Sequence, residues 1–198
     1  MSKYGDKYPW LKRRDVNDYF DDEEDNWDWM NDMPEGWRIA FGDLFVEELD
    51  AAIKAEGLED EYLVLQVKEK HGTLRWYDYA SSKKINDIVE KYSLLSGHIC
   101  MNCGTIDIPM LSFGWLAPLC KDCYEKHINC TKTYEEVVVG ESTMPNARAY
   151  RKFSHEFDPK GWKDFEVDIS DTVRKIRELY TERMAAGFEA NSCTWTEN

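Results

Sequence analysis

The 198-residue sequence has no run of apolar residues that approaches the ~18 needed for a membrane-spanning helix. Its first residues are basic but no apolar stretch follows them, so they do not have the pattern of a secretory signal. The sequence also lacks a P-loop, a G-x-S-x-G turn, an H-E-x-x-H helix and a Rossmann glycine pattern. We therefore expect a cytoplasmic protein, and no motif marks an enzyme.

Histidines, the side chains that most often exchange protons near neutral pH, are few and scattered. The four are His71, His98, His127 and His155. Aspartate and glutamate together number 39, so no two of them stand out as a catalytic pair. An enzyme is therefore the least favoured of three hypotheses for the function.

The acidic residues are concentrated near the N-terminus. The formal net charge is −14, and residues 15–36 hold ten of the acids and none of the bases. Such a field repels nucleic acid and attracts basic surfaces. Aromatic side chains between the acids offer contact area, so we expect an aromatic-rich acidic arm over residues 1–36. This arm docks either on the protein's own core or on a partner. The candidate partner-binding residues are Asp21, Asp22, Glu23, Glu24, Asp25, Trp27, Asp28 and Trp29.

Apolar periodicity predicts an α+β core over residues 37–129. Apolar residues at helical spacing indicate helices over 35–55 and 81–96. Between them, residues 61–79 have the β-branched and apolar pattern of a hairpin. The expected order is helix, β-hairpin and helix, followed by a cysteine-rich module.

A two-residue turn at His71-Gly72 would place two like charges opposite each other in this hairpin. Lys68 then faces Arg75 across the ladder, which is unfavourable. A compensating group is expected, and the candidates are Glu69, Asp78, the acidic arm or an anionic ligand. The residues that could bind an anion are Lys68, Lys70, His71 and Arg75.

Residues 130–198 form a predicted α/β extension of the core. The sequence pattern predicts, in order, a strand, an irregular connection, a second strand and a helix, over Tyr134–Val139, 140–161, Phe165–Ile169 and 171–186. The helix carries an apolar stripe, ending at Met184, that is expected to face inward.

Two C-x-x-C pairs account for four of the six cysteines. Cys100 and Cys103 are followed, after sixteen residues, by Cys120 and Cys123. In a reducing compartment this spacing is typical of zinc, because two thiolates on one tight turn reach an ion at about 2.3 Å and two such turns complete a tetrahedron. Four sulfur ligands close the coordination shell, so we expect one structural Zn²⁺ ion.

The residues around the cysteines predict how this module folds. Gly104 suits the positive φ that the turn after the second thiolate adopts. A short hairpin between the pairs and a helix over 121–129 give a treble-clef-like order. Such an ion contributes on the order of 10 kcal/mol to folding. His98 and His127 are less favoured alternatives to one of the cysteines, and the other two cysteines are spare thiols.

These elements together resemble a widespread uncharacterised family of bacterial and phage proteins, over about residues 33–127. The resemblance is carried by Gly36-Trp37, the run from Gln66 to Tyr77, the Cys-x-x-Cys-Gly turn, Gly114-Trp115 and the Leu119-Cys120-x-x-Cys123 turn. It implies a compact α+β zinc module and a mobile-element origin, and it implies no activity.

Two functions are weighed on this basis. The first is a zinc-stabilised acidic protein, encoded by a phage or mobile element, that acts in the cytoplasm of a bacterial host. It would bind and inhibit or modulate a host protein or ribonucleoprotein machine, as anti-defence proteins do, through its carboxylates and aromatic side chains. The alternative is a nucleic-acid-binding zinc ribbon that uses Lys68, Lys70 and Arg75, which the acidic overall charge disfavours.

Overall fold

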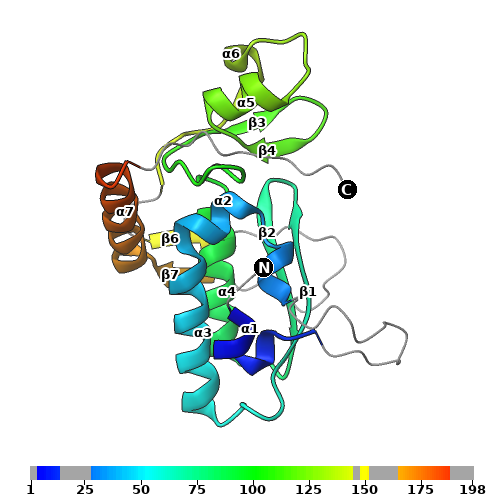
Figure 1. Cartoon of the computed structure of the whole chain (residues 1–198), viewed down its shortest axis with the longest axis vertical. Helices are drawn as coiled ribbons and strands as arrows, with labels where there is room; N and C mark the ends of the chain where they lie inside the picture. The colour runs from blue at the N-terminus through cyan, green and yellow to red at the C-terminus, as the bar shows by residue number, and fades with distance from the viewer. Residues whose placement is uncertain (1–3, 14–27, 145–147, 152–164, 188–198) are drawn as a thin grey trace.

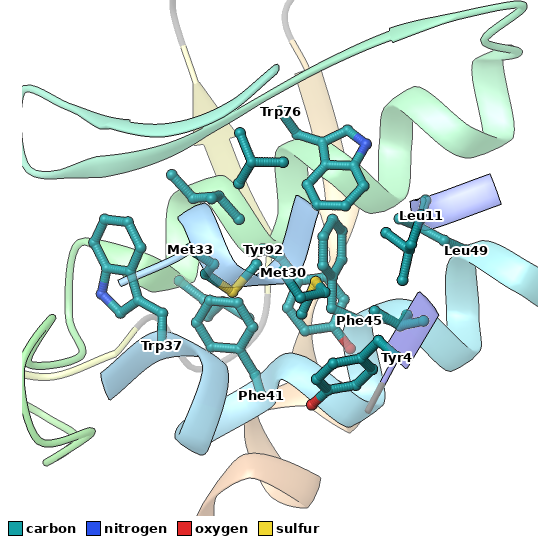
Figure 2. Close-up of a cluster of buried hydrophobic side chains, with 14 of the residues drawn as sticks. Tyr4, Leu11, Met30, Met33, Trp37, Phe41, Phe45, Leu49, Trp76 and Tyr92 are labelled. Atoms are coloured by element: carbon teal, nitrogen blue, oxygen red, sulfur yellow. The ribbon is translucent and has the colours of Figure 1, made fainter. Parts of the chain in front are cut away.

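The computed structural model is of an α+β protein and describes residues 4–13, 28–144, 148–151 and 165–187 (Figure 1). Its core packs the antiparallel hairpin β1 (Leu63–Lys70) and β2 (Thr73–Tyr79) against helices α3 (Asp43–Glu56) and α4 (Lys83–Ser96). Figure 2 shows the aromatic centre of this core. Its side chains come from all of these elements and from the N-terminal segment, and they include Trp37, Phe41, Phe45, Trp76 and Tyr92.

The helix predicted over 35–55 is confirmed, with an irregular second turn. It consists of α2 (Glu35–Trp37), a π-helical turn η3 (Arg38–Gly42) and α3. The ring of Phe45 lies 4.9 Å from the rings of both Trp76 and Tyr92, measured between centroids. Gly57 ends the helix with φ +67°, a left-handed conformation that glycine adopts without strain.

The predicted hairpin is also confirmed, together with its register. His71 and Gly72 form a two-residue turn with φ +54° and +76°, the positive values that match the twist of a tight hairpin. Lys68 therefore pairs with Arg75, as the sequence indicated. A bulge between Val64 and Gln66 interrupts the ladder near its open end.

Helix α4 covers the free edge of β2. Ser82 caps the helix by accepting a hydrogen bond from the Ile85 N–H. At the other end of α4, the Ser96 hydroxyl accepts from the Leu74 N–H (2.9 Å) and the Ser93 hydroxyl donates to the Leu74 carbonyl (2.8 Å). These serines replace the hydrogen bonds that a third strand would make, so this part of the edge is not open to pairing.

The described parts of the acidic arm belong to the core. The segment begins with α1 (Tyr4–Lys7) and the 3₁₀ turn η1 (Pro9–Leu11), and resumes with the 3₁₀ turn η2 (Trp29–Asp32). Its buried hydrophobic residues are Tyr4, Tyr8, Trp10, Leu11, Met30 and Met33. An antiparallel bridge joins Lys12 to Asp28, which brings the two ends of residues 13–27 together. Of the two alternatives for this arm, docking on the protein's own core holds for the described residues.

Asp28 is placed differently from the prediction that it binds a partner. It is 2% exposed, and its carboxylate accepts hydrogen bonds from the backbone N–H groups of Gly5 (2.8 Å) and Met30 (2.9 Å). The carboxylate therefore joins the two described parts of the arm and is not available to a partner. Trp29, also predicted to bind a partner, packs partly buried against the core, with the Arg13 guanidinium 4.6 Å from its ring centroid.

The C-terminal extension differs from its predicted elements in three places. Tyr134–Val137 forms helix α6 rather than a strand, because Thr133 and Glu136 make a reciprocal capping box, and only β5 (Val138–Val139) is extended. The connection predicted as irregular contains β6 (Arg148–Arg151), which pairs with β7 (Phe165–Asp168). Helix α7 (Ser170–Ala185) is confirmed, but Met184 is 50% exposed rather than inward-facing.

The side chain of Asp107 makes two of the hydrogen bonds that join this extension to the cysteine module. The carboxylate of Asp107, whose own φ is +55°, accepts from the Met144 N–H (2.8 Å) and from the Arg177 guanidinium on α7 (3.0 Å).

None of the helices that the structure describes is both long enough and apolar enough to cross a membrane.

Replacing Asp28 with alanine is expected to destabilise the protein by about 2–4 kcal/mol. It removes the cap of η2 and leaves the buried Gly5 N–H without its acceptor. Urea denaturation followed by tryptophan fluorescence measures the change. Asp6→Ala is the control, because the Asp6 side chain is 86% exposed and its ion pair with Lys12 contributes less than about 1 kcal/mol. Equal unfolding midpoints for the two variants would show that Asp28 does not hold the arm.

Candidate metal centre

The four cysteines of the two C-x-x-C pairs come together in a small module at one end of the core (Figure 1). The module contains the sheet β4–β3–β5 and helix α5, with β3 at Met110–Ser112, β4 at Leu116–Pro118 and α5 at Lys121–His127. Cys100 and Cys103 lie on a turn closed by the Ile99–Ile106 bridge. Cys120 is the N-cap residue of α5, and Cys123 lies in its first turn.

The sulfur positions fit a tetrahedral metal ion. All four Sγ atoms lie within 4.8 Å of one another, and Cys103 and Cys120 are separated by 3.6 Å. Four sulfurs placed 2.3 Å from one ion would be about 3.8 Å apart. All four residues are buried. The arrangement is therefore consistent with one structural metal ion held by these residues.

The electrostatics of four adjacent thiols also favour a cation. Hydrogen bonds among the sulfurs raise the pKa of Cys100 and Cys123 and lower the pKa of Cys103 and Cys120. The thiols thus share protons unequally, because four negative charges cannot be buried side by side without compensation. A divalent cation at the centre removes this conflict by binding all four as thiolates.

Local backbone hydrogen bonds shape the first cysteine turn. The Gly104 N–H donates to the Cys100 carbonyl (2.9 Å), and the Cys100 N–H donates to the Thr105 carbonyl (2.8 Å). Gly104 has φ +77°, which confirms the predicted need for glycine. The Thr105 hydroxyl lies 3.1 Å from Cys103 Sγ, where it can donate to the thiolate.

Gly36 makes the closest contact between the helical core and this turn. A β-carbon at Gly36 would lie 2.2 Å from the Cys100 carbonyl oxygen and 2.6 Å from the Gly104 nitrogen. The Gly36 N–H donates to the Met101 carbonyl (2.8 Å), and the indole N–H of Trp37 donates to the Ile99 carbonyl (2.9 Å). The start of the first long helix is therefore seated on the metal-binding turn.

The β-hairpin of the core reaches the module at a second point. A β-carbon at Gly72, in the hairpin turn, would lie 2.4 Å from the sulfur of Met110 on β3. Met110 also lies near Gly97, where its methyl group is 3.5 Å from the position of a β-carbon. One methionine thus fills the space between the hairpin turn, the end of α4 and the module.

Aromatic rings surround the rest of the site. Phe113 and Tyr134 each pack against Tyr124 of α5, with centroid distances of 5.4 and 5.9 Å. Burial raises the pKa of Tyr134 to about 12, with a further contribution from the nearby cysteines Cys120 and Cys100. The Tyr134 hydroxyl lies 3.5 Å from the Leu119 carbonyl. These rings belong to, or pack against, the buried cluster that contains the four cysteines.

The less favoured ligands do not join the cluster. Among the described residues, the four cysteines are the group whose ligand atoms converge, and His98 and His127 are not part of it. Both histidines are partly buried. Cys130, predicted to be a spare thiol, is a free thiol outside the cluster.

The predicted anion-binding residues lie on the face of the hairpin that points away from the helices, here called the outer face, and in the turn beside it. Lys68 and Arg75 form a ladder pair, Lys70 pairs with Thr73, and His71 is exposed in the turn. Glu69 and Asp78 do not lie on that face: Glu69 accepts from the Gly72 N–H, and Asp78 accepts from the Tyr62 hydroxyl. The partner-binding residues Asp21, Asp22, Glu23, Glu24, Asp25 and Trp27 lie outside the described residues.

Sequence reasoning missed the residues that join the module to the core. In the sequence, Gly36 stood out only as part of the Gly-Trp pair in the family resemblance, and no pattern singled out Met110. No family model matches the chain, and neither the curated proteins nor the solved structures give a match. The family resemblance therefore stays a prediction.

Substitution of one ligand should release the metal. We expect about one metal ion per chain for the purified protein and a large loss for Cys120→Ser, measured by mass spectrometric metal analysis after dialysis against a chelator. Cys130→Ser, outside the cluster, should keep the metal content of the parent. Retention of a full equivalent by Cys120→Ser would contradict the site.

Gly36→Ala should disturb the metal site from outside its ligand set. Its β-carbon meets backbone atoms that cannot move without shifting the cysteine turn, so we expect a loss of about 3 kcal/mol in unfolding free energy and faster release of metal to a chelator. Gly42→Ala is the control, because the atoms nearest to its β-carbon, at 3.0 Å or more, belong to side chains that can adjust. An unchanged release rate in Gly36→Ala would show that the contact is not tight.

Proposed function

We propose that the chain is a zinc-stabilised binding protein that acts by contacting a basic surface of another protein or of a ribonucleoprotein. The ion is proposed to be zinc because four buried thiolates in tetrahedral order suit Zn²⁺ and leave no open coordination position for catalysis. The order of turn, hairpin, turn and helix supports a treble-clef-like description of the module.

The observation that carries the proposal is the way in which the core holds both ends of the acidic segment. Trp10 and Leu11 are buried before it, Met30 is buried after it, and the Lys12–Asp28 bridge closes it. By sequence, residues 14–27 carry seven acids, one base and three large aromatic side chains. In the chain, these residues therefore connect two segments that the core holds.

Both features of this segment suit recognition of a basic partner. A cluster of carboxylates raises the rate of encounter with a basic surface, and aromatic side chains supply the contacts that hold it. Fixing both ends of a segment lowers the conformational entropy lost when it binds. The inhibitory, phage-encoded role expected from the sequence is a narrower form of this proposal. Identifying the partner would test whether the protein has this narrower role.

The test compares two variants of the full chain with the same number of neutralised acids. One changes Asp22, Glu23, Glu24 and Asp25 to their amides, and the control changes the exposed acids Glu56, Glu59, Asp60 and Glu61. The partner is first captured with the parent protein from nuclease-treated bacterial lysate and identified by mass spectrometry. Association is then measured with the purified partner.

The first variant should associate about tenfold more slowly than the parent or worse, and its rate should depend less on salt. The control should stay close to the parent, since it leaves the acids of residues 14–27 unchanged. Equal rates for the two variants, or no stoichiometric partner of the parent protein, would refute the proposal.

A further inference from the structure

Strand alternation divides the β1–β2 hairpin into two chemically different faces. The inner face buries Val64, Val67, Leu74 and Trp76 against the helices. The outer face is built by the register pairs between them, which are Gln66 with Tyr77, Lys68 with Arg75, and Lys70 with Thr73. Tyr79 continues the outer row at the end of β2.

The same alternation separates the charges of the hairpin. Its two acids on the paired strands, Glu69 and Asp78, stand at inner-face positions and are engaged by the Gly72 N–H and the Tyr62 hydroxyl. The outer face therefore combines three basic side chains with no acidic one. Lys68 stands directly opposite Arg75, whose guanidinium also donates to the Ser93 hydroxyl on α4 (3.2 Å).

Two tyrosines extend this basic surface along β2. Tyr77 is 42% exposed and Tyr79 is 62% exposed. They stand two residues apart on one face of the strand, and therefore about 7 Å from each other along it. The Lys68 ammonium lies 5.3 Å from the centroid of the Tyr77 ring, so a positive charge and an exposed ring are already side by side.

We propose that this outer face binds single-stranded nucleic acid. Tyr77 and Tyr79 stack on successive bases of an extended strand, and Lys68 and Lys70 contact its phosphates. A strand of this kind exposes the flat faces of its bases, which a duplex keeps stacked inside. The proposal goes beyond the protein-binding function above and uses a different surface of the molecule.

The acidic net charge of the chain does not prevent such contact. At physiological ionic strength the field of a charge is screened over about 8 Å, so an acid farther than this from the outer face acts weakly on it. Affinity then depends on the charges that touch the phosphates, and these are basic. The net charge should lower the rate of encounter, which makes strong binding to random duplex DNA unfavourable.

The test uses fluorescence anisotropy with the metal-loaded full chain and labelled oligomers of about 12 nucleotides. Oligo-dT, oligo-rU and a duplex of equal length form the three arms. The chain should bind at least one single strand more tightly than the duplex, and the two single-stranded arms tell DNA from RNA. Tyr77→Ala and Tyr79→Ala should each weaken binding about fivefold or more, while Tyr79→Phe, which keeps the ring, should bind like the parent.

Charge variants give a second measurement that does not depend on stacking. Lys70→Ala should reduce the slope of log affinity against log salt by about 0.7, the share of one phosphate contact on a single strand. Lys83→Ala is the control, because its side chain is 87% exposed and forms an ion pair with Asp87 on α4. Far-ultraviolet circular dichroism and metal content verify that each variant is folded. Absence of binding to both single strands, equal binding to the duplex, or parent-like affinity of both alanine variants at Tyr77 and Tyr79 would overturn the proposal.

Discussion

The packing of four thiols within 4.8 Å of one another is the interaction that constrains the rest of the molecule. They cannot all be ionised together, because buried thiolates at this spacing repel one another unless a cation lies between them. The geometry of the turns that carry them is therefore consistent with a structural metal ion. The Cys100–Gly104 turn is in backbone contact with Gly36. A change in the geometry of the four sulfurs would therefore also affect the start of the first long helix.

The core depends on such help because its sheet is small. A two-stranded hairpin is marginally stable alone, and this one is completed by other elements along its length. Helix α4 satisfies the outer hydrogen-bonding groups of Leu74, η1 and η2 lie along β1, and Met110 of the module packs on the turn. Each of these contacts joins segments that are distant in sequence. Loss of the metal would thus remove support from both the hairpin turn and the start of the first long helix.

The sequence predicted the elements that depend on local pattern. The helices before and after the hairpin, the register that pairs Lys68 with Arg75, and the four cysteines all follow from spacing alone. The prediction from sequence was wrong for Tyr134–Val139, which was expected to be a strand. The capping box of Thr133 and Glu136 starts a helix there, so only Val138 and Val139 are extended. The prediction also assigned Asp28 to a partner, because a buried carboxylate that accepts backbone hydrogen bonds looks in sequence like any other acid in the run. Contacts such as that of Gly36 with Cys100 join distant segments and leave no periodic signal.

The placement of charge explains how a strongly acidic chain can keep a basic surface. Most of the N-terminal acidity lies between two segments that pack on β1 through η1 and η2, whereas the bases of the hairpin point outward from its ladder. Alternation along the strands keeps Glu69 and Asp78 from neutralising those bases, because each acid is one residue out of phase with them. A shift of one residue in the hairpin register would bring acids and bases to the same face and expose either Val67 or Trp76 to water. The burial that fixes the register of the core therefore also maintains the separation of charge on its surface.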